Sequence, residues 1–294
     1  MDSFMPELTA SHVKMKDKNL VIEKIQNIIN GGVEKLQIIT DFDRTLSKHH
    51  HNGVLSMTSN NIYKLIPTLP REFITGTEQL YTKYRAIEEN PQMSLEDKLP
   101  FMEDWWRLSF QLFIGLPFNQ GDINQAVRDS KIVLRTGTDL AFKNLNKSKI
   151  PVLVFSAGLG NVVSTILNEY NLSFDNVKVI SNFFQVENEK IVGLQGGLIH
   201  VFNKNQHAIE YTTYFQDLKD RINAIVMGDS LGDANMSDGL QGNGYILKIG
   251  FLSSHIDEYL PQYLEKFDIV LLDDQTMDLF NALIEKIVSA RGLN

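Results

Sequence analysis

The sequence predicts an α/β fold with a parallel sheet core and an inserted helical cap domain. Two observations lead to this class. Short apolar, β-branched runs alternate with helical patterns, which is typical of parallel sheets whose strands are buried on both faces. From about residue 49 to residue 130 this alternation stops, and the chain reads mainly as helix. We therefore expect residues 1–48 and 131–294 to form the core and residues 49–130 to form the cap.

Four apolar runs are expected to be strands of the core. They are LQIIT at 36–40, IPVLVFS at 150–156, INAIVMGD at 222–229 and DIVLLDD at 268–274. Each run carries a polar or acidic residue at its C-terminal end. Since ligands of open α/β sheets bind beyond the carboxyl ends of the strands, we expect the functional site at this edge.

Helical patterns fill the spaces between the strands and most of the expected cap. NVVSTILNEY at 161–170 lies in the core, and the cap contains EQLYTKYRAIEE at 78–89 and SLEDKLPFMEDWWRLSFQLF at 94–113. Ser94 and Asp97 have the spacing of a capping box that opens the second cap helix. Pro100 fits this helix poorly, and we expect a kink or a restart there.

Composition limits the classes of function. The 294 residues carry a formal net charge of −8, which argues against a broad nucleic-acid-binding surface, since that needs an excess of basic residues. The chain has no cysteine, which excludes disulfides and cysteine–zinc sites. Its start lacks the pattern of a signal peptide, and no apolar run approaches the length of a membrane span. We expect a cytoplasmic monomer that acts on small molecules.

Two aspartates close the first expected strand. Alternate residues share a face, so the carboxylates of Asp41 and Asp43 can point to the same side. Such a pair suits a hard divalent cation such as Mg²⁺. It also suits phosphoryl transfer, in which one carboxylate attacks phosphorus and the other donates a proton to the leaving group. A solvated Asp-rich turn is the alternative for this motif taken by itself.

Further polar residues follow in a definite order. Ser156 and Ala157, followed by a glycine, offer a hydroxyl and backbone N–H groups that can hold a phosphate. Lys204 can neutralise a transferred phosphoryl group. Asp229 can supply a metal ligand, with Asp233 orienting that ligand or a bound water. Taken singly, a Ser-Gly turn and a surface lysine are the alternatives, whereas the ordered set indicates one site.

The order DxDxT, Ser, Lys, GDSxxD resembles that of the haloacid dehalogenase-like phosphatases, and the inserted helices match the cap between the first two motifs of that superfamily. The strings IITDFDRTLS, FSAGLG, GGLIHVFNKN, VMGDSLGDANMSDG and YILKIGFL resemble the cytosolic 5′-nucleotidase III family. The likeness spans roughly residues 20–290 and includes the cap segment YRAIEENP. It implies a HAD-like Rossmannoid core and a Mg²⁺-dependent 5′-nucleotidase.

The resemblance also implies roles for single residues. Asp41 would be the nucleophile and a magnesium ligand. Asp43 would be the proton donor, with its backbone carbonyl as a further ligand, and Asp229 would complete the metal site. We expect Thr45 to fix the Asp43 carboxylate by a hydrogen bond.

The remaining implied roles concern the substrate. Ser156, Ala157 and Lys204 would hold the phosphate, and Glu88 in the cap would contact the nucleoside. The implied substrates are small nucleoside monophosphates.

Two branches of the family differ in their substrates. One prefers the pyrimidine monophosphates CMP and UMP, and the other accepts CMP and 7-methylguanosine monophosphate. The pair Trp105-Trp106 resembles the second branch. N7-methylguanine carries a positive charge, which an aromatic face attracts by roughly 0.5–2 kcal/mol, so we expect Trp106 to be a platform for the base.

Ser109 and Phe110 are expected to line the same pocket, although relatives tend to have a histidine where this chain has Phe110. Arg44, where relatives tend to have methionine, is a second departure, and contact with substrate and exposure to solvent are both open for it. Simple packing of the cap is the alternative, because helical spacing also links four apolar residues: Met102, Trp106, Phe110 and Phe113.

Three classes of function compete. The first is the nucleotidase, with a variant restricted to CMP and UMP. The second is a non-catalytic nucleotide-binding protein on the same fold, which would be expected to lack the nucleophile or the metal ligands. The third is a phosphatase for another metabolite such as phosphoserine, and the nucleotidase-like cap argues against it. We expect the enzyme.

Overall fold

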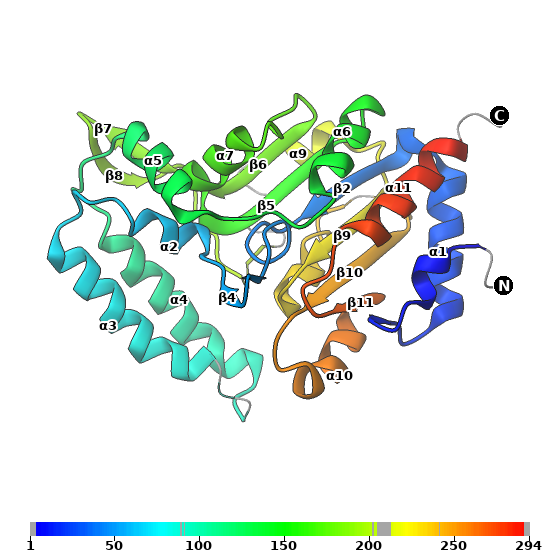
Figure 1. Cartoon of the computed structure of the whole chain (residues 1–294), viewed down its shortest axis with the longest axis horizontal. Helices are drawn as coiled ribbons and strands as arrows, with labels where there is room; N and C mark the ends of the chain where they lie inside the picture. Colours follow the sequence, from blue (N-terminus) through cyan, green and yellow to red (C-terminus); the bar gives the residue numbers. More distant parts are fainter. Residues whose placement is uncertain are drawn as a thin grey trace.

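A mostly parallel sheet lies at the centre of the molecule in the computed structural model (Figure 1). The structure describes residues 4–88, 90, 92–201, 203–204, 213–240 and 242–290. Within the described residues, seven strands form this sheet in the order β1-β11-β10-β9-β2-β5-β6, and only β1 runs antiparallel to its neighbour. The strands are β1 (Val13–Lys14), β2 (Leu36–Thr40), β5 (Val152–Leu159), β6 (Val177–Asn182), β9 (Asn223–Gly228), β10 (Ile246–Leu252) and β11 (Ile269–Leu272).

All four strands expected from the sequence are present as β2, β5, β9 and β11. The order along the sheet places β2 between β9 and β5, so three of the expected strand ends are neighbours. β5 extends to Leu159, beyond the expected end at Ser156, but its regular pairing with β6 breaks after Phe155. The α/β fold class with a parallel core is therefore confirmed.

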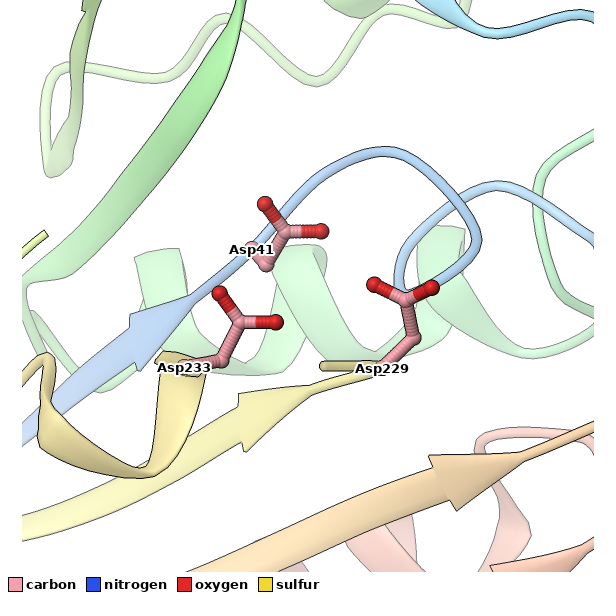
Figure 2. A group of neighbouring side chains, drawn as sticks. All are labelled: Asp41, Asp229 and Asp233. Atoms are coloured by element: carbon pink, nitrogen blue, oxygen red, sulfur yellow. The ribbon is translucent and has the colours of Figure 1, made fainter. Parts of the chain in front are cut away.

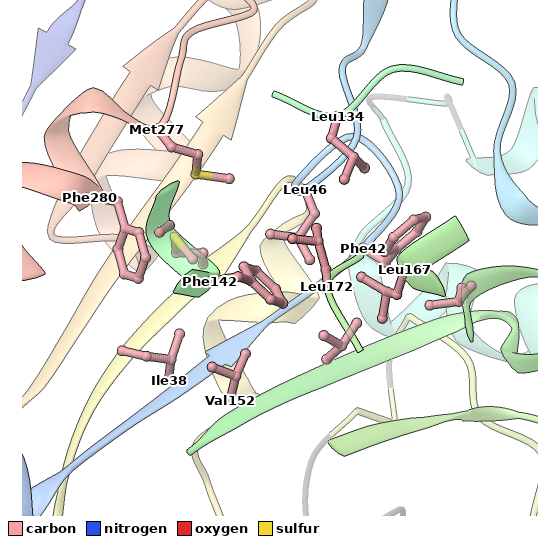
Figure 3. Close-up of a cluster of buried hydrophobic side chains, with 14 of the residues drawn as sticks. Ile38, Phe42, Leu46, Leu134, Phe142, Val152, Leu167, Leu172, Met277 and Phe280 are labelled. Atoms are coloured by element: carbon pink, nitrogen blue, oxygen red, sulfur yellow. The ribbon is translucent and has the colours of Figure 1, made fainter. Parts of the chain in front are cut away.

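Alternate residues of the strands feed two separate parts of the core. Ile38, Val152 and Val154 belong to a large cluster with Phe142, Leu167 and Phe280, from helices on one face of the sheet (Figure 3). Ile39, Leu153 and Phe155 point to the other face and pack with Phe215 and Met236. This period of two is the reason why the strands read as continuous apolar runs, because both of their faces are buried.

The helices cover both faces and the end of the sheet. They are α1 (Lys18–Gly31), α2 (Ser59–Tyr63), α3 (Arg71–Glu88), α4 (Leu95–Gln111), α5 (Gln120–Ser130), α6 (Thr138–Lys147), α7 (Gly160–Glu169), α9 (Tyr214–Asp217), α10 (Ile256–Lys266) and α11 (Asp278–Ala290), with 3₁₀ turns η1 (Pro6–Thr9), η2 (Val33–Lys35) and η3 (Leu231–Asn235). Among the described residues, no helix combines the length and the apolar character needed to cross a bilayer.

The segment 49–130, expected to be a cap, supplies α2, α3, α4, α5 and the small hairpin of β3 (His50–His51) and β4 (Val54–Leu55). None of the described strands of the seven-stranded sheet comes from it. Helices α3 and α4 lie side by side at one end of the molecule, away from α1 and α11 (Figure 1). A second hairpin, β7 (Phe184–Glu187) and β8 (Lys190–Leu194), approaches this segment, because Gly115 N donates to Ile191 O.

The expected start of α4 is confirmed, and the expected restart at Pro100 is wrong, whereas the alternative of a kink there stays a prediction. Ser94 is the N-cap, and its hydroxyl accepts a hydrogen bond from Asp97 N at 3.1 Å. The helix continues through Pro100 to Gln111 as one element. A proline near the start of a helix removes few hydrogen bonds, since the first four N–H groups have no partner within the helix and Pro100 comes soon after them.

A buried arginine fixes the loop that follows β2. Arg135, only 1% exposed, donates through Nε to Thr45 O at 2.7 Å and through Nη2 to Arg44 O. Its Nη1 donates to Asp274 Oδ1 at 2.8 Å, and its guanidinium lies 4.1 Å from the centroid of the Phe251 ring. The first turn after Asp41 and Asp43 is thus tied to the loop after β11 by one side chain.

We predict that Arg135→Met lowers the free energy of unfolding by about 3–5 kcal/mol, because it leaves Asp274 without its buried partner and removes the donors to three backbone carbonyls, those of Arg44, Thr45 and Gln275. Urea unfolding would measure the loss. Arg128→Met is the matched control, since Arg128 pairs with Glu169 at the surface, and it is expected to cost less than about 1 kcal/mol. Equal losses for the two variants would contradict this assignment.

Candidate active site

The two strand-end aspartates meet because β2 and β9 are paired in register. Thr40 lies opposite Met227 in this pair, and Asp41 N donates to Met227 O at 2.9 Å. Asp41 directly follows β2 and Asp229 directly follows β9, so both side chains lie at the same edge of the sheet. This is the edge at which the sequence predicts the site.

Asp233 joins them from η3. A Cβ atom on Gly228 would lie 2.1 Å from Asp233 Cβ, so only glycine at 228 lets η3 approach the end of β9 this closely. Carboxylate oxygens of Asp41, Asp229 and Asp233 all lie within 4.8 Å of one another. Figure 2 shows the three carboxylates converging from the ends of β2 and β9 and from η3. An all-oxygen donor set of this kind fits a hard divalent cation.

Lys204 is the cation inside this group. Its side chain is 3% exposed, and Nζ donates to Asp41 Oδ1 and, at 2.9 Å, to Asp233 Oδ1. Asp233 Oδ2 accepts from Ser230 N at 2.9 Å and from Ser230 Oγ at 2.7 Å. Both oxygens of Asp233 are therefore engaged by protein donors, so Asp233 fixes the position of Lys204.

The electrostatics of the cluster are unbalanced. Burial raises the pKa of Asp41 to about 7, and Asp233 adds to this shift while Lys204 opposes it. Burial, then the charges of Asp41 and Asp233, also raises the pKa of Asp229. Burial alone would lower the pKa of Lys204, but the two bonded carboxylates together raise it. One ammonium does not compensate three carboxylates, and a divalent cation between Asp41 and Asp229 would supply the missing positive charge.

Asp43 lies beside this cluster with a partner that the sequence did not indicate. Its Oδ1 accepts from Ser59 N at 2.8 Å, and its Oδ2 accepts from Ser59 Oγ at 2.6 Å. The expected hydrogen bond from Thr45 is wrong: Thr45 Oγ1 is buried and has no hydrogen-bond partner among the described residues. Burial raises the pKa of Asp43, and the two hydrogen bonds from Ser59 oppose the shift.

The expected phosphate-holding residues lie next to Asp43. Ser156 and Ala157 are buried near the end of β5, and Ser156 Oγ accepts from Gly158 N at 3.0 Å. A Cβ atom on Gly158 would lie 3.0 Å from Asp43 Oδ2 and 3.2 Å from Ser156 Oγ. The structure therefore brings together Asp41, Asp43, Ser156, Lys204 and Asp229 from four separate parts of the sequence.

The two tryptophans of α4 point in different directions. Trp106 is half-buried and packs against the core cluster that contains Ala157 and Phe155. Trp105 instead stacks on Tyr84 of α3, with ring centroids 5.9 Å apart and planes inclined by 11°. Of the pair, only Trp106 packs against the cluster that contains Ala157, one of the expected phosphate-holding residues.

The other expected pocket residues are placed less uniformly. Phe110 packs with Phe113 and Phe184, at centroid distances of 6.0 and 6.4 Å, so packing accounts for at least part of its position. Ser109 is half-buried on α4. Glu88, the last residue of α3, accepts a hydrogen bond from Arg85 Nη1 at 2.6 Å.

Arg44 is a cation beside the acidic cluster. It adopts a positive φ of 62°, and its Nε is buried without a hydrogen-bond partner among the described residues. Burial raises the pKa values of Asp43 and Asp229, and the charge of Arg44 opposes both shifts. Its side chain therefore turns toward the site and not simply into solvent.

Comparison with known proteins agrees with this arrangement. The family model described as pyrimidine 5′-nucleotidase (UMPH-1) matches residues 44–288. A 7-methylguanosine phosphate-specific 5′-nucleotidase from Drosophila melanogaster is 41% identical over 292 residues, covering 99% of this chain and 92% of that protein. The human protein of the same name is 35% identical over 282 residues, covering 96% and 94%.

Solved structures extend the comparison to the fold. Cytosolic 5′-nucleotidase IIIB bound to cytidine superposes with a TM-score of 0.93 at 40% identity, covering 99% of this chain and 98% of that one. A probable phosphoserine phosphatase from Vibrio cholerae shares only the fold, with a TM-score of 0.55 at 14% identity over 92% of this chain and 70% of its own. The chain therefore belongs to the pyrimidine 5′-nucleotidase (UMPH-1) family of phosphoric monoester hydrolases, on a haloacid dehalogenase-like fold.

Proposed function

We propose that this chain is a Mg²⁺-dependent 5′-nucleotidase that hydrolyses 7-methylguanosine monophosphate and CMP to nucleoside and phosphate. The observation that carries the proposal is the cluster of Asp41, Asp229 and Asp233 around the buried Lys204, with Asp43 beside it. The names of the relatives support the two substrates, because several act on 7-methylguanosine phosphate and a close structural match holds cytidine.

The metal would be held by the carboxylates of Asp41 and Asp229 and by the backbone carbonyl of Asp43. Magnesium, when bound, neutralises charge that develops on the phosphoryl oxygens. Asp233 is proposed to act through Lys204 and not as a direct ligand, since its two oxygens already accept hydrogen bonds from Lys204 and Ser230.

The chemistry is proposed to pass through Asp41. Its free carboxylate oxygen attacks phosphorus, the bond from phosphorus to the 5′ oxygen breaks, and an aspartyl-phosphate forms. Asp43 gives a proton to the departing 5′ oxygen and later takes one from the water that cleaves the acyl phosphate. Ser156, Ala157 and Lys204 hold the phosphoryl oxygens meanwhile, and Lys204 keeps Asp41 in place before substrate enters.

The base is proposed to bind under the helical segment 49–130, which acts as a cap. Trp106 supplies the aromatic face, since it is the tryptophan that turns toward Ala157 and its cluster. Glu88, Ser109 and Phe110 complete the pocket when the cap closes. We also propose a cytoplasmic location, in line with the relative named cytosolic 5′-nucleotidase IIIB, and a monomeric state.

A second candidate is a pyrimidine nucleotidase that acts on CMP and UMP only. The family description, pyrimidine 5′-nucleotidase, favours it. In that case Trp106 would serve as a packing residue, and no charged base would be needed to explain it.

We predict phosphate release from 7-methylguanosine monophosphate and CMP, little release from GMP and AMP, and loss of all release in EDTA. The charge of the methylated base is the reason for preferring it to GMP. A phosphate assay on these substrates and UMP, with Mg²⁺ and with EDTA, measures this. Use of CMP and UMP alone would select the second candidate, and activity that persists in EDTA would contradict the metal site.

We predict that Trp106→Ala raises KM for 7-methylguanosine monophosphate by about 2- to 30-fold, and more than KM for CMP, because only the methylated base carries a formal positive charge. Steady-state kinetics on both substrates gives the ratio. Trp105→Ala is the matched control on the neighbouring residue, since Trp105 stacks on Tyr84, and it should leave that ratio unchanged. An equal effect of the two substitutions on the ratio would reject Trp106 as the platform.

A further inference from the structure

We propose that Ser59 is the positioning residue for Asp43 and sets which carboxyl oxygen of Asp43 delivers the proton to the leaving nucleoside. The inference rests on the proposed function, because it assigns a partner to the proposed acid. It concerns a residue of the inserted segment, outside the motifs that the sequence singles out.

Ser59 contacts both oxygens of the Asp43 carboxylate. Its backbone N donates to Oδ1 at 2.8 Å, and its hydroxyl donates to Oδ2 at 2.6 Å. Ser59 is the first residue of α2 and is fully buried. Its N–H is available because the first N–H groups of a helix have no partner inside the helix. A single residue therefore fixes both the position and the rotation of the acid.

The two donors differ in what they permit. A backbone N–H can only donate, so it favours Oδ1 as the acceptor and Oδ2 as the oxygen that carries the proton of the neutral acid. A hydroxyl can donate or accept, and a protonated carboxyl keeps acceptor capacity. The contact between Ser59 Oγ and Oδ2 can therefore persist in both protonation states of Asp43.

The surroundings hold Ser59 in place. In the same short helix, Ile62 and Tyr63 are 0% and 2% exposed and belong to the core cluster of β2 and β5. A Cβ atom on Gly158 would lie 1.9 Å from Ser59 Oγ, so the absence of a side chain at 158 provides the space that the hydroxyl fills. Ser59 is therefore anchored on its own helix and against β5.

The consequence lies in the bond-breaking step. When phosphorus leaves the 5′ oxygen, the bonding electron pair stays on that oxygen, which takes the proton from Asp43 Oδ2. In the second half-reaction Asp43 receives a proton from the attacking water, and the acid is restored. Removal of the Ser59 hydroxyl frees Asp43 to rotate, so the proton is less often aimed at the 5′ oxygen, while attack by Asp41 is unaffected.

A pair of substrates separates this role from a merely structural one. The cytidine of CMP leaves as a 5′-alkoxide and needs a proton. The analogue with sulfur in place of the bridging 5′ oxygen instead releases a 5′-thiolate, whose conjugate acid is a thiol with a pKa of about 8.5. We expect Ser59→Ala to lower kcat/KM for CMP by about tenfold or more, because misplacing the acid loses part of the contribution of general acid catalysis. The same substitution should change kcat/KM for the thio analogue by less than about threefold.

Ser59→Cys keeps a side chain of similar shape with a weaker donor, and should give a smaller loss of the same selectivity; it serves as the second variant if Ser59→Ala does not fold. Ser181→Ala is the matched control, because Ser181 is an equally buried serine whose Oγ donates to Gly158 O at 2.9 Å, on the same glycine but not on Asp43. It should affect both substrates equally.

Asp43→Asn tests the foundation separately. It should show the same selectivity for the thio analogue with a larger loss on CMP, and if it does not, the proposed acid role of Asp43 fails. If Asp43→Asn is selective but Ser59→Ala and Ser59→Cys lower both substrates equally, or neither, then Ser59 does not position the acid and the inference is overturned.

Discussion

The arrangement of the site depends on one buried cation held among carboxylates. Lys204 bonds Asp41 and Asp233 in a nearly closed environment, and Asp229 lies within reach of both acids. Three acids so close together repel one another unless positive charge lies between them. The register of β2 against β9 and the missing side chain at Gly228 bring the acids together, so the fold itself creates the concentration of negative charge on which the proposed metal site depends.

In the proposed mechanism, the inserted segment contributes to the chemistry as well as to the pocket. Ser59 begins its first helix and holds Asp43, while Trp106 on α4 packs against the cluster of Ala157. Arg135 links the loop after β2 to the loop after β11, because it donates to Thr45 O and to Asp274 Oδ1. The inserted segment therefore holds Asp43, the proposed acid, and the core holds the loop after β2. The proposed active geometry needs both parts in place.

Much of this could be predicted from the sequence, and the rest depends on contacts distant along the chain. The apolar runs that end in Asp41 and Asp229 predicted both the strands and the location of the site, since a strand buried on both faces is a continuous apolar run in the sequence. Strand β10 was not predicted from the sequence, because Lys248 interrupts its apolar run. In the structure, the backbone N of Lys248 donates to Asp268 Oδ2. Thr45 was expected to hold Asp43 because it is near in sequence, whereas Ser59 reaches it through the fold of α2, which no spacing reveals.

The most direct test of the central claim is to trap the phosphorylated enzyme. The enzyme would be mixed with CMP carrying labelled phosphate and Mg²⁺, quenched in acid during turnover, and mapped by peptide. The account predicts label on the peptide that contains Asp41, and none on Asp41→Asn, which should also lose activity because an amide cannot form the acyl phosphate. Near-normal phosphate release by Asp41→Asn, with no label on the wild-type peptide, would contradict it.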